Sequence, residues 1–233
     1  MIFGLFRFDW TILLVIPGII ISVWAQIKVQ STFSKYSKIN TASRMTGYMA
    51  ARRILDENGL SHVAIEHING HLSDHYDPRA NVIRLSNSVY SSSSPAAIGV
   101  AAHEAGHAIQ YARDYAPIRF RARLVSITQF SSMLAIPLFF IGLIFASDGL
   151  MLAGILLYAT IAFFQLVTLP VEFNASSRAM AVLNDSKLLN KEELKASKKV
   201  LSAAAMTYVA ALLTSLLTLL RLLLLANRGS RRN

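Results

Sequence analysis

The run VSITQFSSMLAIPLFFIGLIFASDGLMLAGILLYATIAFFQLVTLPV (residues 125–171) decides the fold. It contains two apolar stretches, 125–146 and 150–171, separated only by the turn-forming triplet Ser-Asp-Gly. A helix needs about 20 mostly apolar residues to cross the hydrocarbon core of a bilayer, and each stretch is long enough. Because the short connection turns the chain back at once, the run predicts an antiparallel hairpin of two membrane-spanning helices.

Two further apolar stretches lie at 10–26 and 203–226, the second interrupted by Arg221. The composition agrees with a membrane protein, since 54% of residues are hydrophobic, 15% are charged and the mean hydropathy is +0.44. The N-terminus leads into the first stretch without a clear small-x-small cleavage site, which indicates an uncleaved membrane anchor at 1–26. The sequence therefore predicts a mainly α, multi-span helical membrane protein whose last span and basic tail occupy 203–233.

Basic residues are divided unevenly between the two sides that four spans define. Twelve Lys and Arg lie between the first and second spans and six between the third and fourth. The other side carries four, which are Arg7, Arg228, Arg231 and Arg232. Because basic loops stay in the cytoplasm, both polar segments, 27–124 and 172–202, are predicted to face it.

The net charge of +10 could suggest a nucleic-acid partner. The basic residues, however, are spread through the polar segments with no aromatic-interleaved basic motif, so no nucleic acid is expected. The chain has no cysteine, which excludes disulfides, thiolate ligands and a cysteine nucleophile. Any metal must therefore be held by His, Asp, Glu or water.

Three elements are expected in the first half of the polar segment 27–124. Residues 41–58 predict an amphipathic helix capped by Thr41 or Ser43. Residues 63–66 and 81–85 predict two short strands forming a β-hairpin. The strand at 81–85 is expected at an edge, where it could pair with an extended substrate.

The segment PAAIGVAAHEAGHAIQYA (95–112) predicts a buried helix, started by a serine N-cap and a proline at its first position. His103 and His107 lie one turn apart on one face, so that two imidazoles converge on one ion. Glu104 is rotated by about 100° and reaches a metal-bound water instead. This is the zincin arrangement for one zinc ion, and it predicts a small α+β zincin-like catalytic region within 27–124.

A catalytic zinc needs a third protein ligand and an open position. The metzincin pattern is excluded because Gln110 and Arg113 occupy its Gly and ligand positions, and Asp114 is one residue out of register. Glu172 is the predicted third ligand. It ends the third apolar stretch, where an unpaired acid is costly, and two spans return it to the side of His103.

Four passages resemble the bacterial neutral zinc metallopeptidases of the YugP type: HYDPR (75–79), VIRLS (82–86), HEAGHAIQ (103–110) and LPVEFNAS (169–176). This resemblance implies zinc, peptidase activity and Glu172 as the carboxylate ligand. A more distant similarity is to the HtpX-like and CAAX prenyl proteases, in which the second motif usually reads Glu-x-x-Ala-Asp. Here the fifth position is Ser176, so a carboxylate that orients a ligand histidine cannot be assumed.

The predicted function is zinc-dependent hydrolysis of peptide bonds near the cytoplasmic surface of the bacterial plasma membrane. Glu104 is the expected general base, and it later protonates the leaving amine. The oxyanion needs a donor besides the metal, and the candidates are Tyr208, His75 and Arg178. The helix at 95–112 is too short and too polar at its ends for a fifth span, which places the site outside the lipid.

The main alternative is a zinc-stabilised membrane chaperone or assembly scaffold that hydrolyses nothing. Glu104 separates the two hypotheses, because a structural zinc site needs no general base and is usually closed by four protein ligands. A transporter is less favoured, since Arg221 is the single ionisable residue deep in a span. The expected partners are a protein or peptide substrate and the lipid bilayer, with an oligomer or a regulatory membrane partner left open.

Overall fold

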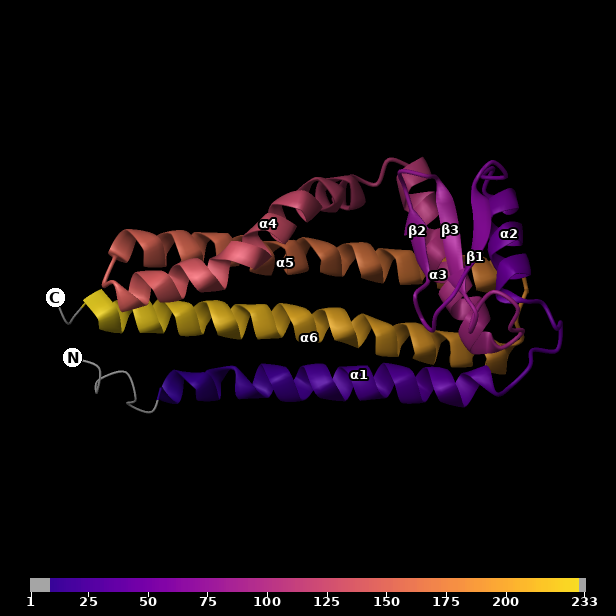
Figure 1. Ribbon diagram of the computed structural model, residues 1–233. Helices are drawn as coiled ribbons and strands as arrows, with labels where there is room; N and C mark the ends of the chain where they lie inside the picture. Colours follow the sequence, from indigo (N-terminus) through magenta and orange to yellow (C-terminus); the bar gives the residue numbers. More distant parts are fainter. Residues whose placement is uncertain (1–8, 231–233) are drawn as a thin grey trace. The chain divides into compact units, whose positions relative to one another are not determined.

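The computed structural model describes residues 9–230, without the side chains of 228–230. Among the described residues, four helices are long and apolar enough to cross a membrane, which confirms the predicted spans and the mainly α class. They are α1 (Ile16–Ser37, preceded by a 3-10 helix at Trp10–Leu14), α4 (Ala116–Ile144), α5 (Asp148–Asp185) and α6 (Lys191–Ser230) (Figure 1). Arg7, Arg231 and Arg232, and the Arg228 side chain, lie outside the described residues.

The helices are longer than the apolar stretches that predicted them. α5 begins near the expected residue but continues past 171 to Asp185, and Pro170 lies inside it. The continuation contains Ala175, Ala179 and Ala181, and alanine is the residue that most favours helix. One polar metal-site candidate, Glu172, therefore lies on the same continuous helix as a membrane span.

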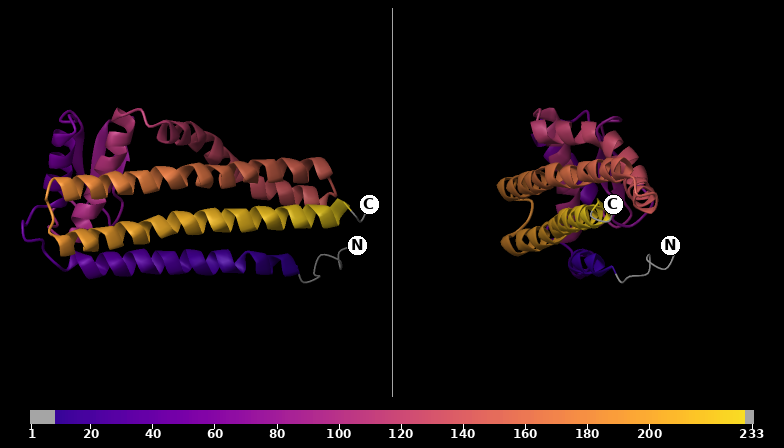
Figure 2. Two further views of the ribbon diagram at one scale, coloured as in Figure 1. Left: turned by 180° about the vertical axis from the view of Figure 1, so that it is seen from behind. Right: turned by 90° about the vertical axis from the view of Figure 1, so that its left-hand side faces the viewer.

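The chain divides into two compact units. The first contains residues up to Trp24, 120–168 and those from Tyr208 onward. Figure 2 shows α4 and α5 joined by a tight turn within this unit, as predicted. Their backbones pack closely, because a Cβ on Gly154 would lie 2.7 Å from the backbone nitrogen of Phe139. Arg221 pairs with Asp9 at 2.8 Å, which neutralises the cation in the last span.

The second unit comprises residues 25–119 and 169–207 and contains a three-stranded sheet. Its strands are β1 (Ala64–Ile68), β2 (His75–Asp77) and β3 (Val82–Ser86), in the order β1-β3-β2. β1 pairs with β3 in parallel and β2 pairs with β3 antiparallel. The predicted hairpin of 63–66 with 81–85 is therefore wrong, because those strands run in parallel and β2 lies between them in sequence.

The position predicted for the strand at 81–85 is also wrong. β3 is the middle strand, and the two edges belong to β1 and β2. Four of its five residues are buried, as is typical of a strand covered on both sides. An extended substrate could not pair with β3, so β2 is the edge that matters for the site described below.

Helices α2 (Gly47–Glu57) and α3 (Pro95–Ala112) pack together against the sheet. The hydroxyl of Thr46 caps α2 by accepting from the amide of Met49. Thr41, one of the two predicted caps, is buried and donates instead to the carbonyl of Ser93. The predicted start of α3 is confirmed, since Ser94 accepts from Ala97 and Pro95 is the first helical residue.

Candidate metal centre

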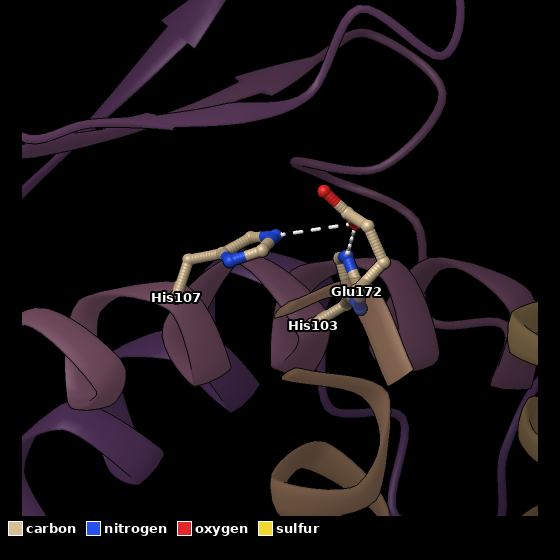
Figure 3. A group of neighbouring side chains, drawn as sticks. All are labelled: His103, His107 and Glu172. Atoms are coloured by element: carbon tan, nitrogen blue, oxygen red, sulfur yellow. Dashed lines mark hydrogen bonds and ion pairs between the residues drawn. The ribbon is translucent and has the colours of Figure 1, made fainter. Parts of the chain in front are cut away.

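Three predicted ligands, His103, His107 and Glu172, come together in the second unit (Figure 3). Their ligand atoms all lie within 4.8 Å of one another. Nε2 of His103 and Nε2 of His107 are 3.2 Å and 3.5 Å from Oε2 of Glu172. The histidines come from successive turns of α3 and the carboxylate from α5, so the structure joins side chains that are far apart in the sequence.

The donor set fits zinc. Two imidazole nitrogens and one carboxylate oxygen are ligands that zinc prefers, and a catalytic zinc has three protein ligands with one position left for water. Within residues 9–230, this group of His and acidic ligand atoms has three members. The carboxylate of Glu172 is almost fully buried, with 3% of its side chain exposed. A buried carboxylate facing two imidazoles is stable when a cation or a proton neutralises it.

The close approach of α3 and α5 depends on Gly106. A Cβ built there would lie 2.7 Å from the carbonyl oxygen of Ala175, closer than real Cβ atoms come to backbone. The helices meet at this point with the two histidines on either side of the glycine along α3. Gly106 therefore allows α3 to come close enough for Glu172 to complete the site.

We expect Gly106→Ala to destabilise the protein by roughly 1–3 kcal/mol, the usual cost of overpacking, and to reduce zinc content. Alanine normally favours a helix over glycine by about 1 kcal/mol. A loss of stability in Gly106→Ala would therefore come from the close contact between α3 and α5. Thermal unfolding and metal analysis of the purified protein measure both effects. Gly149→Ala is the control, since a Cβ there meets nothing within 4 Å. Equal behaviour of the two variants would refute the role given to Gly106.

Gln110 orients His107. It is fully buried, and its amide nitrogen donates to the carbonyl of Val171 at 2.8 Å and to Oδ1 of Asn174 at 2.9 Å. Its amide oxygen lies 3.0 Å from Nδ1 of His107. Because both amide hydrogens are used, the oxygen must accept from Nδ1–H, and this tautomer leaves the Nε2 lone pair of His107 for a metal.

Ser176 contacts the corresponding ring nitrogen of His103. Its hydroxyl lies 3.1 Å from Nδ1 of His103, so an N–H at Nδ1 leaves Nε2 for the metal. Ser176 is the position where the more distant proteases usually carry Asp. In this chain, the group that contacts Nδ1 of His103 is therefore the hydroxyl of Ser176 and not a carboxylate.

The pKa of His107 responds to its surroundings in two opposing ways. Burial lowers the pKa, but the hydrogen bond to Glu172 and the charges of Glu104 and Glu172 outweigh it, so the pKa lies above its ordinary value of 6.5. A proton therefore competes with a metal for the imidazole up to higher pH. Metal affinity should fall as the pH drops through this pKa and rise above it.

Glu104 lies on α3 beside the ligands but takes a different partner. It is 7% exposed, and its Oε2 accepts a hydrogen bond of 2.9 Å from the backbone amide of Tyr76 on strand β2. This agrees with a position rotated away from the two histidines on the helix. The carboxylate thus stays outside the ligand group while being held at a defined place next to it.

The three predicted oxyanion donors do not belong to the group of ligand atoms. Arg178 donates to Asn174 at 2.7 Å and lies over the ring of Tyr115, 5.7 Å from its centroid. His75 is exposed and its ring Nδ1–H donates to the carbonyl of Ser73. Tyr208 lies on α6 in the first unit.

Asp114, which is one residue out of the metzincin register, follows the end of α3. It is exposed and pairs with Arg119. It does not belong to the group of ligand atoms around Glu172.

Sequence reasoning missed Tyr76, Gln110 and Asn174 as parts of the site. Gln110 and Asn174 lie in the HEAGHAIQ and LPVEFNAS passages, and Tyr76 lies in HYDPR. A single amide side chain on a mostly apolar helix, three residues after a ligand histidine, was the available signal for Gln110. Tyr76 had none, because it acts through its backbone.

Fold and site together define a class, a multi-span helical membrane protein with an HExxH helix and a later carboxylate converging on one metal position. The chain belongs to the family described as "Putative neutral zinc metallopeptidase", whose model matches residues 11–227. It is 46% identical to the "Putative membrane protease YugP" of Bacillus subtilis (strain 168) over 222 residues, 95% of this chain and 99% of the relative. No solved structure matches. The resemblance noted in the sequence is confirmed.

Proposed function

We propose that this chain is a membrane-embedded, zinc-dependent endopeptidase, with His103, His107 and Glu172 as the metal ligands. The observation that carries the proposal is the convergence of these three side chains within 4.8 Å beside the buried Glu104. The family description and the name of the B. subtilis relative support a protease role. Protein or peptide chains are the corresponding substrate class.

Bound zinc would supply Lewis-acid activation of a water molecule for attack on the scissile carbonyl. Glu104 accepts the proton of the attacking water and hands it to the leaving amine nitrogen, so that the peptide bond breaks with no net change in protons on the carboxyl. The amide of Tyr76 holds Glu104 ready for both steps. Gln110 holds His107 in the tautomer that leaves Nε2 available for the metal, and Ser176 contacts Nδ1 of His103, so that Nε2 of that ring faces the metal position.

The donor to the oxyanion remains among the three sequence candidates. The contacts of Arg178 with Asn174 support a positioning role, since Asn174 in turn accepts from Gln110. His75 is next to Tyr76 on β2 and exposed, so its ring is accessible to a substrate beside Glu104. Tyr208 is the third candidate, on α6.

We place the metal site on the cytoplasmic side of a bacterial plasma membrane. Eighteen Lys and Arg lie in the two polar segments and four on the opposite side, which is the bias that orients membrane proteins. The bacterial relative supports the choice of membrane. The non-catalytic scaffold is less well supported, because the group offers three ligands instead of four and has a carboxylate placed next to it.

Removal of the metal tests the proposal directly. The detergent-purified protein, stripped with a chelator, should lose cleavage of a proteome-derived peptide library and regain it with one equivalent of zinc. Asp114→Ala is the control and should behave as wild type, because this carboxylate is exposed and paired with Arg119. A stripped protein that cleaves as fast as the zinc-loaded one would refute the proposal.

A further inference from the structure

Asp74 anchors the chain just before β2 to the end of β3. Its Oδ1 accepts from the backbone amide of Ser86 at 2.7 Å, and its Oδ2 accepts from the hydroxyl of Ser86 at 3.0 Å. Ser86 is fully buried and Asp74 is half-buried. Both carboxylate oxygens are therefore used to tie one segment of the chain to the middle strand.

The anchored segment needs such a tie. Leu72 has a φ of 54°, in the left-handed region that costs energy for a branched-chain residue. Besides the pairing of β2 with β3, a long hydrogen bond holds the segment to the end of β3, from the amide of Leu72 to the hydroxyl of Ser88 at 3.4 Å. The shorter bonds of Asp74 are thus the stronger attachment at this end.

Two residues after Asp74, the backbone of Tyr76 reaches the active-site helix. Its amide donates to Oε2 of Glu104, and its ring packs on that of Tyr111 on α3, with centroids 5.6 Å apart. Tyr76 is the central residue of β2 and pairs with Ile83 of β3. Any shift of β2 along β3 would therefore move the amide that holds Glu104.

We propose that Asp74 is a positioning residue: by tying the start of β2 to Ser86, it keeps the amide of Tyr76 where it orients the carboxylate of Glu104. This inference rests on the proposed function, in which Glu104 is the general base. Asp74 touches neither substrate nor metal ligands, and it acts through the strand. The path runs from Ser86 through Asp74 and Tyr76 to Glu104, and each non-covalent link is a hydrogen bond shorter than 3.1 Å.

The charges around Asp74 are consistent with a positioning role for this residue. Burial raises the pKa of Asp74 and the nearby charge of Glu104 adds to this rise, while the bonds from Ser86 oppose it. A second carboxylate close to Glu104 is electrostatically unfavourable. The tie to Ser86 is the compensating interaction at this position.

The test compares Asp74→Ala with Asp74→Asn in the zinc-loaded, detergent-purified protein. Asparagine can still accept from the Ser86 amide and bond its hydroxyl, but it carries no charge. We expect Asp74→Ala to lower kcat about 10- to 100-fold, as small misplacements of catalytic groups do, with KM and zinc content unchanged. Asp74→Asn should stay within about threefold of wild type, since it preserves these bonds. Glu66→Ala is the matched control, an exposed carboxylate of the same sheet bonded to Arg84.

A second readout does not depend on activity. Residue-resolved hydrogen exchange at the Tyr76 amide should speed up about tenfold or more in Asp74→Ala and in Glu104→Ala, because a hydrogen bond protects it, and stay slow in Asp74→Asn. Should Asp74→Ala fail to fold, Ser86→Ala removes one of the two bonds and should show the same changes at smaller size.

The outcomes separate the two ideas. Wild-type kcat and amide protection in Asp74→Ala would overturn the positioning role while leaving the peptidase proposal intact. Equal losses in Asp74→Asn and Asp74→Ala would overturn it as well, by showing that charge matters instead of the tie. An inactive wild-type protein would refute the peptidase proposal, and the exchange at Tyr76 would still decide whether the tie exists.

Discussion

Replacing Glu104 with glutamine is expected to lower kcat about 100- to 10,000-fold, the range for loss of a general acid–base group, with zinc content unchanged. Glutamine has nearly the same size and its amide oxygen can still accept from the Tyr76 amide. It cannot take a proton from water. Single-turnover cleavage of a peptide from the library and metal analysis of the same sample measure the two quantities.

A control for this experiment is Glu66→Gln, which makes the same chemical change at an exposed residue of β1. It should leave both cleavage and zinc at wild-type levels. If Glu104→Gln kept zinc and cleaved as fast as wild type, the general-base role would be wrong. Zinc loss without a change in the other ligands would instead assign Glu104 to the metal.

Glu172→Ala should weaken zinc binding by more than about 100-fold, since even residues that only orient a ligand are worth about 10- to 100-fold in affinity. The change removes the one carboxylate in the group and the partner of both imidazoles. Competition with a chromophoric chelator measures the affinity. Cleavage should fall in parallel, because the loss acts through the metal.

Gln110→Ala provides a graded comparison with Glu172→Ala. It leaves all three ligands in place but removes the bond that sets the tautomer of His107, so a loss of about 10- to 100-fold is expected. The order wild type, Gln110→Ala, Glu172→Ala should hold for zinc affinity. Full affinity in Glu172→Ala would move the third ligand elsewhere in the chain.

The parts of the fold that sequence could predict are those set by local composition. Four apolar stretches of this length predict helices, because a helix satisfies all backbone hydrogen bonds within one segment in the bilayer. The serine N-cap and the proline in the first turn predicted the start of α3. The helical repeat also placed His103 and His107 on one face, and the count of spans brought Glu172 to their side.

The pairing of the strands was beyond such reasoning. β2 has three residues, too few to show alternation, and the parallel pairing of β1 with β3 joins segments about 18 positions apart that no local pattern links. The bond from Gln110 to Asn174 joins residues 64 positions apart, and no periodicity in the sequence marks it. The tie from Tyr76 to Glu104 uses a backbone group, which residue identity does not reveal.

The position of Glu172 on α5 bears on how the protein is made. His103 and His107 leave the ribosome first, and the proposed third ligand follows only after α4 and the apolar part of α5 have been synthesised. On this ligand set, a nascent chain cannot assemble its metal site before the hairpin is available for insertion. Zinc loading would then be a late step of biogenesis, after both apolar stretches of the hairpin have been made.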